Sequence, residues 1–362
     1  MGNNQPLTYG TAGVDDEPEA LSRLIAAIRP TLQLRCGMGE PLLDVGHFAN
    51  LIRLTNDLAL ALAADGVGTK LLVAQMTGQY ETIGIDCVAM NANDLLCVGA
   101  EPIALVDYLA VEELDGNVLE SIGIGLAKGA VEANVVIAGG ELAQLREIVK
   151  GTHEGVGFDL AAMCVGVVQP SQLITGANLE AGDVLIGLPS SGIHSNGFTL
   201  ARRVLFDRMG WNVDKYVPEF GRTVGEELLE PTRIYVAETL ELIRSDVRVK
   251  ALAHITGGGF LNLLRTTRPA HLVIDKLPAQ PPIFDVIQQL GGIPEEEMPA
   301  VFNLGVGFSI TVARPDTESA LNLLEAHGAD PFILGEIKDT ESAQVDIVPH
   351  QLVGSGNRFN RI

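Results

Sequence analysis

Basic residues, cysteines and aromatic side chains are all scarce in this sequence of 362 residues. Its 24 Lys and Arg residues stand against 46 Asp and Glu, which gives a formal net charge of -22 at pH 7. Nucleic acid and anionic membranes repel so acidic a protein, and we exclude both as partners. The same charge repels ATP at long range, so a nucleotide site in this chain needs local glycines, a lysine and Mg²⁺.

Cysteines with metal-binding or disulfide spacing are also missing. The four cysteines are Cys36, Cys87, Cys97 and Cys164, and no C-x-x-C pair occurs among them. They predict reduced packing residues and exclude a zinc site or a disulfide framework. No apolar signal region opens the sequence, and no apolar run approaches the roughly 20 residues of a membrane-spanning helix. We therefore expect a cytoplasmic protein.

What the sequence does contain is apolar material for two cores, since 47% of its residues are hydrophobic. A chain of this length is too long for one ordinary core. A long apolar strand is predicted at residues 158–168, and Gln169-Pro170-Ser171 then breaks the pattern. We place the domain boundary there, which divides the chain into residues 1–168, residues 169–350 and a mobile tail, residues 351–362.

The stretch Asp65-Gly66-Val67-Gly68-Thr69-Lys70 gathers the parts of a phosphate and metal site in one turn after an apolar strand. Glycines let backbone N–H groups approach an anion, the lysine adds a mobile positive charge, and the aspartate is a magnesium ligand. The glycine spacing is not that of a Walker A loop. A strand followed by a glycine turn with a surface lysine explains the same residues, so both interpretations stay open.

Residues 85–98 have the apolar spacing of a buried helix, yet they include Asp86, Asn93 and Asp94. Polar groups inside an apolar element cost free energy unless partners satisfy them. Asp86 and Asn93 are seven residues apart, about two helical turns, and therefore share one face. That face is a candidate wall of a functional site.

Three further turns carry polar residues beside strands. Gly139-Gly140-Glu141 places a carboxylate and two glycines directly after a predicted strand, which repeats the arrangement at Asp65. Thr256-Gly257-Gly258-Gly259 and the turn at Asn303 adjoin strands of the second half. The last two suit a tight turn and a strand cap.

The loop at residues 190–197 is rich in serine, glycine and asparagine and leads into an amphipathic helix, residues 198–209. A loop of this kind at a helix N-terminus presents N–H groups and hydroxyls to a phosphate or a polar substrate. A structural helix cap at Ser195 or Asn196 would require the same residues.

Taken in order, these motifs resemble the phosphoribosylformylglycinamidine cyclo-ligase (AIR synthetase) family over nearly the whole chain. The matching segments are Tyr9…Ala12-Gly13-Val14-Asp15, Asp65–Lys70, Gly84-Ile85-Asp86…Asn93-Asp94…Gly99-Ala100-Glu101-Pro102, Gly139–Glu141, Ser190–Gly197, Pro231–Tyr235, His254–Gly259 and Phe302–Gly307. The resemblance implies a two-domain α/β (α+β) protomer. Its N-terminal, ATP-binding domain has a mixed sheet that forms a shared barrel across a homodimer, and its C-terminal α/β sandwich domain completes the substrate cleft.

The resemblance also implies a reaction. ATP phosphorylates the formyl amide oxygen of formylglycinamidine ribonucleotide, the amidine nitrogen attacks the activated carbon, and phosphate leaves as the imidazole ring closes. An amide oxygen is a poor leaving group, and phosphorylation makes it a good one. The protein has to position two reactants and neutralise charge on the transferred phosphoryl group, which calls for Mg²⁺, lysine and backbone donors.

Each residue that matches the family motifs acquires an expected role. The expected magnesium ligands are Asp65, Asp94 and Glu141. The expected nucleotide contacts are Asp65, Gly66, Gly68, Thr69, Lys70, Asn93, Gly140 and Glu141. The expected contacts to the ribonucleotide are Ser191, His194, Ser195, Asn196, Thr256, Gly257, Gly258 and Asn303. The expected catalytic groups are Lys70, Asp94 and His194, with His194 transferring a proton, although a lone histidine often has a structural role.

The sequence departs from the family pattern at three places. Residues 142–146 are Leu-Ala-Gln-Leu-Arg where the family has Thr-Ala-Glu-Met-Pro, residues 46–49 are Gly-His-Phe-Ala in place of Gly-Gly-Phe-Gly, and Ala64 replaces Thr or Ser. These changes surround the expected site. Two alternatives therefore stay open: a paralogue that uses ATP to phosphorylate another small substrate, and a catalytically weak nucleotide-binding protein.

Overall fold

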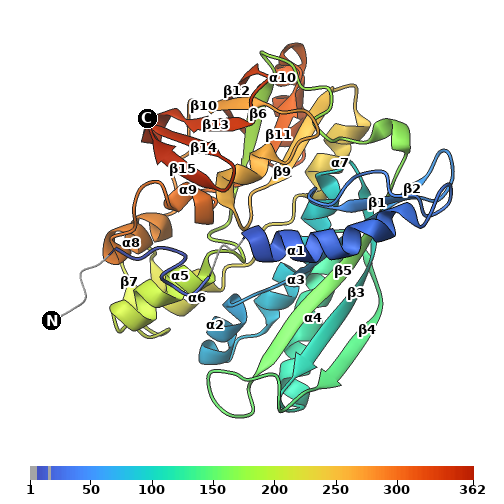
Figure 1. Ribbon diagram of the computed structural model, residues 1–362. Helices are drawn as coiled ribbons and strands as arrows, with labels where there is room; N and C mark the ends of the chain where they lie inside the picture. Colours follow the sequence, from blue (N-terminus) through green and yellow to red (C-terminus); the bar gives the residue numbers. More distant parts are fainter. Residues whose placement is uncertain (1–5, 15–17) are drawn as a thin grey trace.

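A computed structural model describes residues 6–14 and 18–362, and its strands form two main sheets (Figure 1). Strands from residues 50–168 form the first sheet, and strands from residues 184–361 form the second. Helices pack against the sheets in both halves of the chain. The protomer is therefore the two-domain α/β protein with a mixed N-terminal sheet that the resemblance implied.

The N-terminal sheet has one face covered by helices and one face open. In order across the sheet, its strands are β1 (Asn50–Arg53), β2 (Ala59–Gly66), β5 (Phe158–Val168), β3 (Glu101–Val111) and β4 (Val136–Gln144). All neighbouring strands are antiparallel except β3 and β4, which are parallel. Buried residues alternate with less buried ones along β5, because only the helix-facing side chains enter the core.

The helices on the covered face are α2 (Lys70–Thr77), α3 (Glu81–Leu96) and α4 (Gly116–Glu132). α3 and α4 approach so closely that side chains do not fit between them at two glycines. A Cβ atom on Gly125 would lie 1.7 Å from the carbonyl oxygen of Glu81, and one on Gly84 would lie 2.4 Å from the backbone nitrogen of Leu126. This contact fixes α3, which carries Asp86, Asn93 and Asp94.

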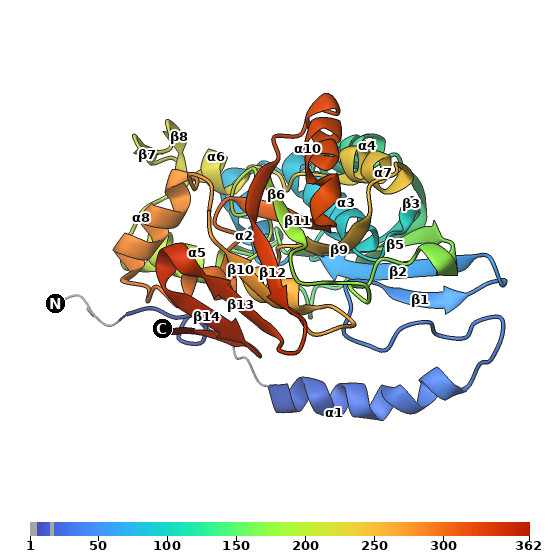
Figure 2. The same ribbon diagram turned by 90° about the horizontal axis from the view of Figure 1, so that it is seen from above.

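The remaining helix of this half, α1 (Pro18–Ile28), stands off from the open side of the sheet (Figure 2). Leu21, Leu24 and Ile28 recur at helical spacing, and their exposed fractions are 59%, 61% and 47%. α1 therefore presents an apolar stripe that nothing in the described chain covers. No helix among residues 6–14 and 18–362 has the length and apolar character needed to cross a membrane.

The C-terminal sheet has eight strands and holds the larger core. In order across the sheet they are β15 (Arg358–Arg361), β14 (Leu352–Ser355), β13 (Gln344–Ile347), β10 (His271–Ile274), β12 (Phe332–Asp339), β6 (Val184–Pro189), β11 (Val306–Val312) and β9 (Val249–His254). Every residue of β11 is buried, as expected for a central strand covered on both faces. The helices of this half are α5 (Phe198–Arg202), α6 (Val224–Leu228), α7 (Val236–Arg244), α8 (Pro282–Gly291), α9 (Met298–Val301) and α10 (Thr317–Ala326). A short hairpin pairs β7 (Tyr216–Val217) with β8 (Arg222–Thr223).

The last residues of the chain differ from the sequence prediction. Residues 351–362, expected as a mobile tail, contribute β14 and β15 to the C-terminal sheet. Leu352 is fully buried and Phe359 is 4% exposed. The strands are only four residues long, so their alternation is too short to stand out in the sequence, and their pairing with β13 is what makes them regular.

Candidate active site

Asp65 ends β2 and is held there by a buried residue of α3. Its backbone N–H donates to Asn91 Oδ1 at 2.9 Å, and Asn91 Nδ2 donates back to the Asp65 carbonyl at 3.1 Å. The Asp65 carboxylate accepts the N–H of Gly66 at 2.7 Å. β1 pairs with β2 only as far as Leu62, so beyond that point the Asn91 side chain provides the hydrogen bonds that a neighbouring strand would make.

Asp94 brings a second carboxylate to the same place and joins it to the other domain. Burial first, and then the negative charge of Asp94, raise the pKa of the Asp65 carboxyl. Asp94 Oδ1 lies 2.9 Å from Nδ1 of His254, a fully buried residue that ends β9. Two carboxylates of the N-terminal domain and one imidazole of the C-terminal domain therefore converge, and a cation between the carboxylates would relieve their repulsion.

Glu141 lies outside this group. The sheet register pairs Asp65 with Ala162 and Ala162 with Asp107, and then pairs Asp107 with Gly140. Three strand spacings of about 4.8 Å therefore separate Asp65 from β4. Because facing residues alternate along a strand, Glu141 points to the open face while Asp65 points to the helices. The predicted magnesium trio does not assemble within one chain, and the described residues contain no cluster of three His, Cys, Asp or Glu that could hold a metal ion.

Gly140, predicted as a nucleotide contact, has a packing reason of its own. A Cβ atom there would lie 2.3 Å from Oδ1 of Asp107 on the neighbouring strand. Burial raises the pKa of Asp107, which faces the helix layer as Asp65 does. Glycine is therefore required at this position to leave room for a carboxylate, whatever ligand the site binds.

Lys70 is not on the surface of the phosphate turn. Its side chain is fully buried, and Nζ lies 2.7 Å from Asp86 Oδ2. Nζ also donates to the carbonyl oxygens of Glu230, at 2.6 Å, and His194, at 3.2 Å. Burial lowers the pKa of this ammonium, and the Asp86 charge opposes that shift. In this arrangement Lys70 ties two domains together and does not point to a space that a phosphate could occupy.

The polar face of α3 meets the second domain. Asp86 Oδ1 accepts the N–H of Thr232 at 2.7 Å and its hydroxyl at 2.6 Å. Asn93 accepts the N–H of Tyr235 at 2.9 Å and donates to the Arg233 carbonyl at 2.9 Å. Asp86 and Asn93 share a face of α3, as predicted. Their hydrogen-bond partners belong to residues 231–235, so this face forms part of the domain interface and does not line an open site.

The exposed part of the phosphate turn is Gly68 and Thr69. Gly68 has φ +72°, and a Cβ atom there would lie 4.0 Å from the carbonyl oxygen of Ser195. Thr69 Oγ1 lies 3.1 Å from Thr199 Oγ1 at the start of α5. The turn after β2 and the loop before α5, which the sequence presents 120 residues apart, are therefore adjacent in the fold.

His194 is 1% exposed and has a left-handed backbone, φ +62°. Its Nε2 accepts the N–H of Ser191 at 3.2 Å, so the proton of the neutral ring is on Nδ1, which has no hydrogen-bond partner among the described residues. Burial holds the pKa of His194 well below its usual value. The ring is therefore neutral at pH 7 and closed off from solvent, which does not favour the predicted proton transfer in this conformation.

Most of the other residues predicted to contact the substrate form hydrogen bonds that fix the conformation of the loops. Ser191 Oγ donates to the Pro231 carbonyl at 2.5 Å, and Ser195 Oγ lies 3.3 Å from Thr232 Oγ1. Asn303 accepts from Ser190 Oγ and donates to the Gly192 carbonyl, both at 2.9 Å. Thr256 Oγ1 accepts from Asn262 at 3.2 Å. Asn196 meets a further predicted turn, because a Cβ atom on Gly257 would lie 3.2 Å from its Oδ1.

Sequence reasoning assigned no role to three residues that surround the carboxylate pair: Asn91, His254 and Arg265. His254 opens the His-Ile-Thr-Gly-Gly-Gly motif, so a signal for it was present. Arg265 ends the 3₁₀ helix η4 (Gly259–Leu264), with its guanidinium carbon 5.0 Å from the ring centroid of Phe48. Its positive charge lowers the pKa of Asp65. No sequence spacing relates Arg265 to Asp65, 200 positions earlier.

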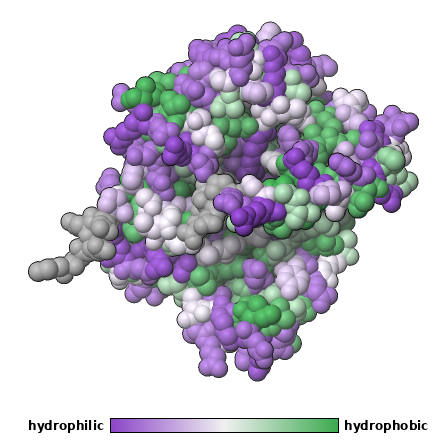
Figure 3. Space-filling view, in the orientation of Figure 1, coloured by the Kyte–Doolittle hydropathy of each residue, from purple (hydrophilic) through white to green (hydrophobic). Residues whose placement is uncertain are grey.

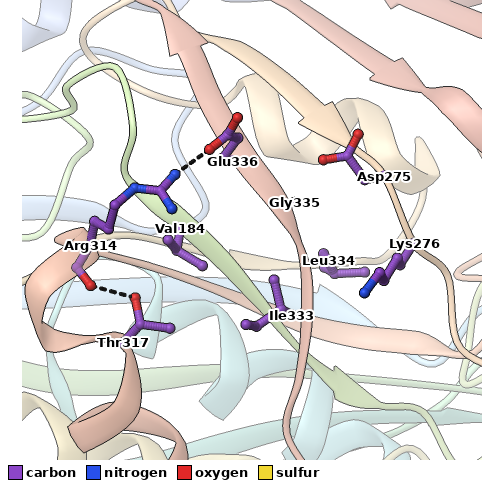
Figure 4. Close-up of a pocket in the computed structure, with 9 residues that line it drawn as sticks. All are labelled: Val184, Asp275, Lys276, Arg314, Thr317, Ile333, Leu334, Gly335 and Glu336. Carbon is purple, nitrogen blue, oxygen red and sulfur yellow. Dashed lines mark hydrogen bonds and ion pairs between the residues drawn. The ribbon is translucent and has the colours of Figure 1, made fainter.

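A separate cavity of about 370 Å³ lies in the C-terminal domain beside β6 and β12 (Figure 4). Arg314 pairs there with Glu336, and Thr317 Oγ1 donates to the Arg314 carbonyl at 2.8 Å. None of the residues predicted for the site lines this cavity. The converging polar groups at Asp65, Asp94 and His254 thus remain the candidate active site.

Two family models match the chain in sequence order. Residues 46–168 match the N-terminal domain of AIR synthase related proteins, and residues 180–348 match the C-terminal domain. The chain belongs to the AIR synthase family. Similar curated proteins are the phosphoribosylformylglycinamidine cyclo-ligases of Thermococcus kodakarensis (48% identity) and Methanobrevibacter smithii (45% identity). The matches cover 94% of this chain in each case and 98% and 97% of the relatives.

Among solved structures, this AIR synthase family member is similar to hydrogenase maturation protein HypE in complex with ATP. The TM-score is 0.59 and the sequence identity is 19%, with 92% of each chain covered. At that identity the likeness concerns the fold alone.

Proposed function

We propose that this protein is an ATP-dependent phosphoribosylformylglycinamidine cyclo-ligase, which makes aminoimidazole ribonucleotide in purine biosynthesis. The observation that carries the proposal is the 45–48% identity to enzymes of that name over 94% of the chain.

The reaction asks the protein to bring two anionic reactants together. The γ-phosphoryl group of ATP passes to the formyl amide oxygen, and the amidine nitrogen then forms a bond to that carbon while phosphate leaves with the oxygen. Asp65 and Asp94 would hold Mg²⁺, which neutralises charge on the transferred phosphoryl group. The exposed backbone of Gly68 and Thr69 at the start of α2 offers N–H donors to the nucleotide phosphates.

In this proposal Lys70 and His194 do not contact the reactants but hold neighbouring loops in place. Lys70 binds the carbonyl of His194 and so fixes the loop before α5 against α3. Ser191 donates to the His194 ring, which holds the same loop from within. Both are therefore positioning residues, which hold the turn at residues 65–70 and the loop at residues 190–197 in fixed positions relative to each other.

The assay that tests the function measures phosphate release from ATP with and without formylglycinamidine ribonucleotide. We expect release only when the ribonucleotide is present, together with formation of the aminoimidazole product. Phosphate release that does not depend on the ribonucleotide would support a paralogue or an ATPase instead, and no release at all would leave only nucleotide binding.

We also propose a homodimer formed through the open face of the N-terminal sheet. Ile103, Val106 and Tyr108 of β3 and Met163 of β5 are exposed by 36–42% on this sheet. Apolar residues gather over the part of the surface where β3–β5 lie (Figure 3). A face of this composition on a protein of charge -22 is costly to leave in water, and a second copy covers it with an identical face.

Sedimentation velocity at micromolar concentration is expected to show a dimer. Replacing Val106 with glutamate should shift the protein to the monomer, because each interface would then bury two like charges. The control is Val348→Glu, which places the same charge on an exposed valine of the other domain and should leave the dimer intact. A monomeric wild-type protein would remove the shared barrel from the proposal.

A further inference from the structure

A cavity of about 770 Å³ lies beside the candidate active site. Four segments that are distant in the sequence form its walls: the loop around Tyr9, η4, α9 and the turn between β14 and β15. α9 and β15 lie side by side in Figure 1. The volume is within the range of about 300–1,000 Å³ that holds small ligands.

The acidic and the basic side chains of this cavity differ in whether they are paired. Glu297 Oε1 accepts the N–H of Tyr9 at 2.6 Å, and Glu296 pairs with Arg361 at 3.3 Å. Arg265 and Arg358, which also line the cavity, form no ion pair with any carboxylate among residues 6–14 and 18–362. The acidic groups thus have partners, while two guanidinium groups keep donors available. In a chain of charge -22, two such cations facing one cavity provide a local site for an anion.

Arg265 links the cavity to the carboxylate pair. Its side chain lines the cavity, and so does Asn262 of η4, which donates at 3.3 Å to the carbonyl oxygen of His254, the residue whose ring lies 2.9 Å from Asp94. The Phe48 ring contacts the guanidinium, with 5.0 Å between the guanidinium carbon and the ring centroid. An anion bound at Arg265 therefore lies beside the carboxylates without occupying their position.

We propose that Arg265 and Arg358 bind the phosphate monoester of the ribonucleotide substrate in this cavity. The proposal rests on the proposed function, which makes the substrate a ribose phosphate. Guanidinium groups match the oxygens of a phosphate bidentately and stay charged at every physiological pH. Apolar side chains of the same cavity, including Val301 and Phe359, suit the carbon skeleton of the ribose. This arrangement anchors the distant end of the substrate and leaves its formyl amide free to approach Asp65 and Asp94.

Calorimetry with ribose 5-phosphate as the probe tests the site directly. Arg265→Gln and Arg358→Gln are each expected to raise its dissociation constant about tenfold or more, because each removes a charge-assisted hydrogen bond. Arg203→Gln is the matched control, since Arg203 is an exposed arginine at the start of the π-helix Arg203–Arg208 and pairs with Asp207. Neutral ribose should bind weakly and equally to all four proteins. Both cavity arginines are exposed, and thermal unfolding should show unchanged folding in the variants.

Kinetics of the full enzyme separates this proposal from the function itself. The two cavity variants should raise KM for formylglycinamidine ribonucleotide by about tenfold or more and leave the affinity for the ATP analogue AMP-PCP unchanged. Variants that bind ribose 5-phosphate like the control, or that weaken AMP-PCP binding instead, would overturn the proposal. A wild-type protein that does not turn over the ribonucleotide would refute the proposed function, and the ribose 5-phosphate titration would still decide the phosphate site.

Discussion

Asp65→Asn is expected to lower kcat for ring closure by about 100-fold or more and to weaken Mg·ATP binding, while the protein stays folded. The expected size is that of removing one electrostatic contact to a transition state. Asparagine keeps an oxygen that accepts the N–H of Gly66, and the bonds to Asn91 involve only the Asp65 backbone. The substitution therefore removes the charge and preserves the end of β2.

The change in the free energy of unfolding caused by Asp65→Asn has a predictable sign. Burial and the charge of Asp94 raise the folded-state pKa of Asp65, so the stability that this group contributes is complete at low pH and is lost as the pH rises through that pKa. At pH 7 the ionised carboxylate is thus a cost to the metal-free protein. Asp65→Asn is expected to leave the free energy of unfolding unchanged or higher at pH 7, as measured by urea denaturation without Mg²⁺.

Asp57→Asn is the control, because Asp57 is an exposed carboxylate in the turn before β2. It should change neither kcat nor the calorimetric affinity for Mg·ATP. Equal Mg·ATP affinity in Asp65→Asn and in the wild type would show that this carboxylate does not bind the metal–nucleotide complex.

Lys70→Met is expected to destabilise the protein by about 3–5 kcal/mol, the usual cost of leaving one member of a buried ion pair without its partner. Lys70 and Asp86 are both 0% exposed, so the remaining carboxylate would keep its bonds to Thr232 but lose its counter-charge. Methionine has a similar length and fills the space. Urea denaturation measures the loss.

Two comparisons make this prediction specific. Lys128→Met breaks the exposed pair with Glu81 and should cost no more than about 1 kcal/mol. The double variant Lys70→Met/Asp86→Asn should be more stable than Lys70→Met alone, because it removes the unpaired buried charge. If Lys70→Met unfolds as the Lys128 variant does and loses ATP affinity, Lys70 is the phosphate ligand that the sequence predicted and the interpretation of the structure is wrong.

The sequence predicted the two-domain fold and the end of β2 well, for a physical reason. Apolar strands that end in glycine and a carboxylate are local patterns, and β2 does end at Asp65 and Gly66 where the pattern placed it. The seven-residue spacing of Asp86 and Asn93 puts them on one face of α3, because helix periodicity is also local. The order of such motifs was enough to indicate the family.

Tertiary structure decided what each polar side chain does. A lysine in a glycine turn is equally suited to face a phosphate or to enter a core, and only the approach of Asp86 and of the Glu230 carbonyl puts Lys70 inside. Likewise, Glu141 and Asp65 follow similar local patterns, but strand order and alternation place them on opposite faces of one sheet. Arg265 and Arg358 become neighbours of one cavity because η4 and the β14–β15 turn meet there.

By itself, then, the sequence determined the two-domain architecture and the position of the glycine turn after β2, but not the strands β14 and β15. The partners of Lys70, the exclusion of Glu141 from the carboxylate pair and the cationic cavity at Arg265 were decided only by the tertiary structure. Local sequence patterns indicate which positions near the end of a strand can carry polar residues. Which of them face each other depends on contacts between separate segments, such as Lys70 with the Glu230 carbonyl and Asp94 with His254, each 160 residues apart, and such contacts leave no spacing in the chain.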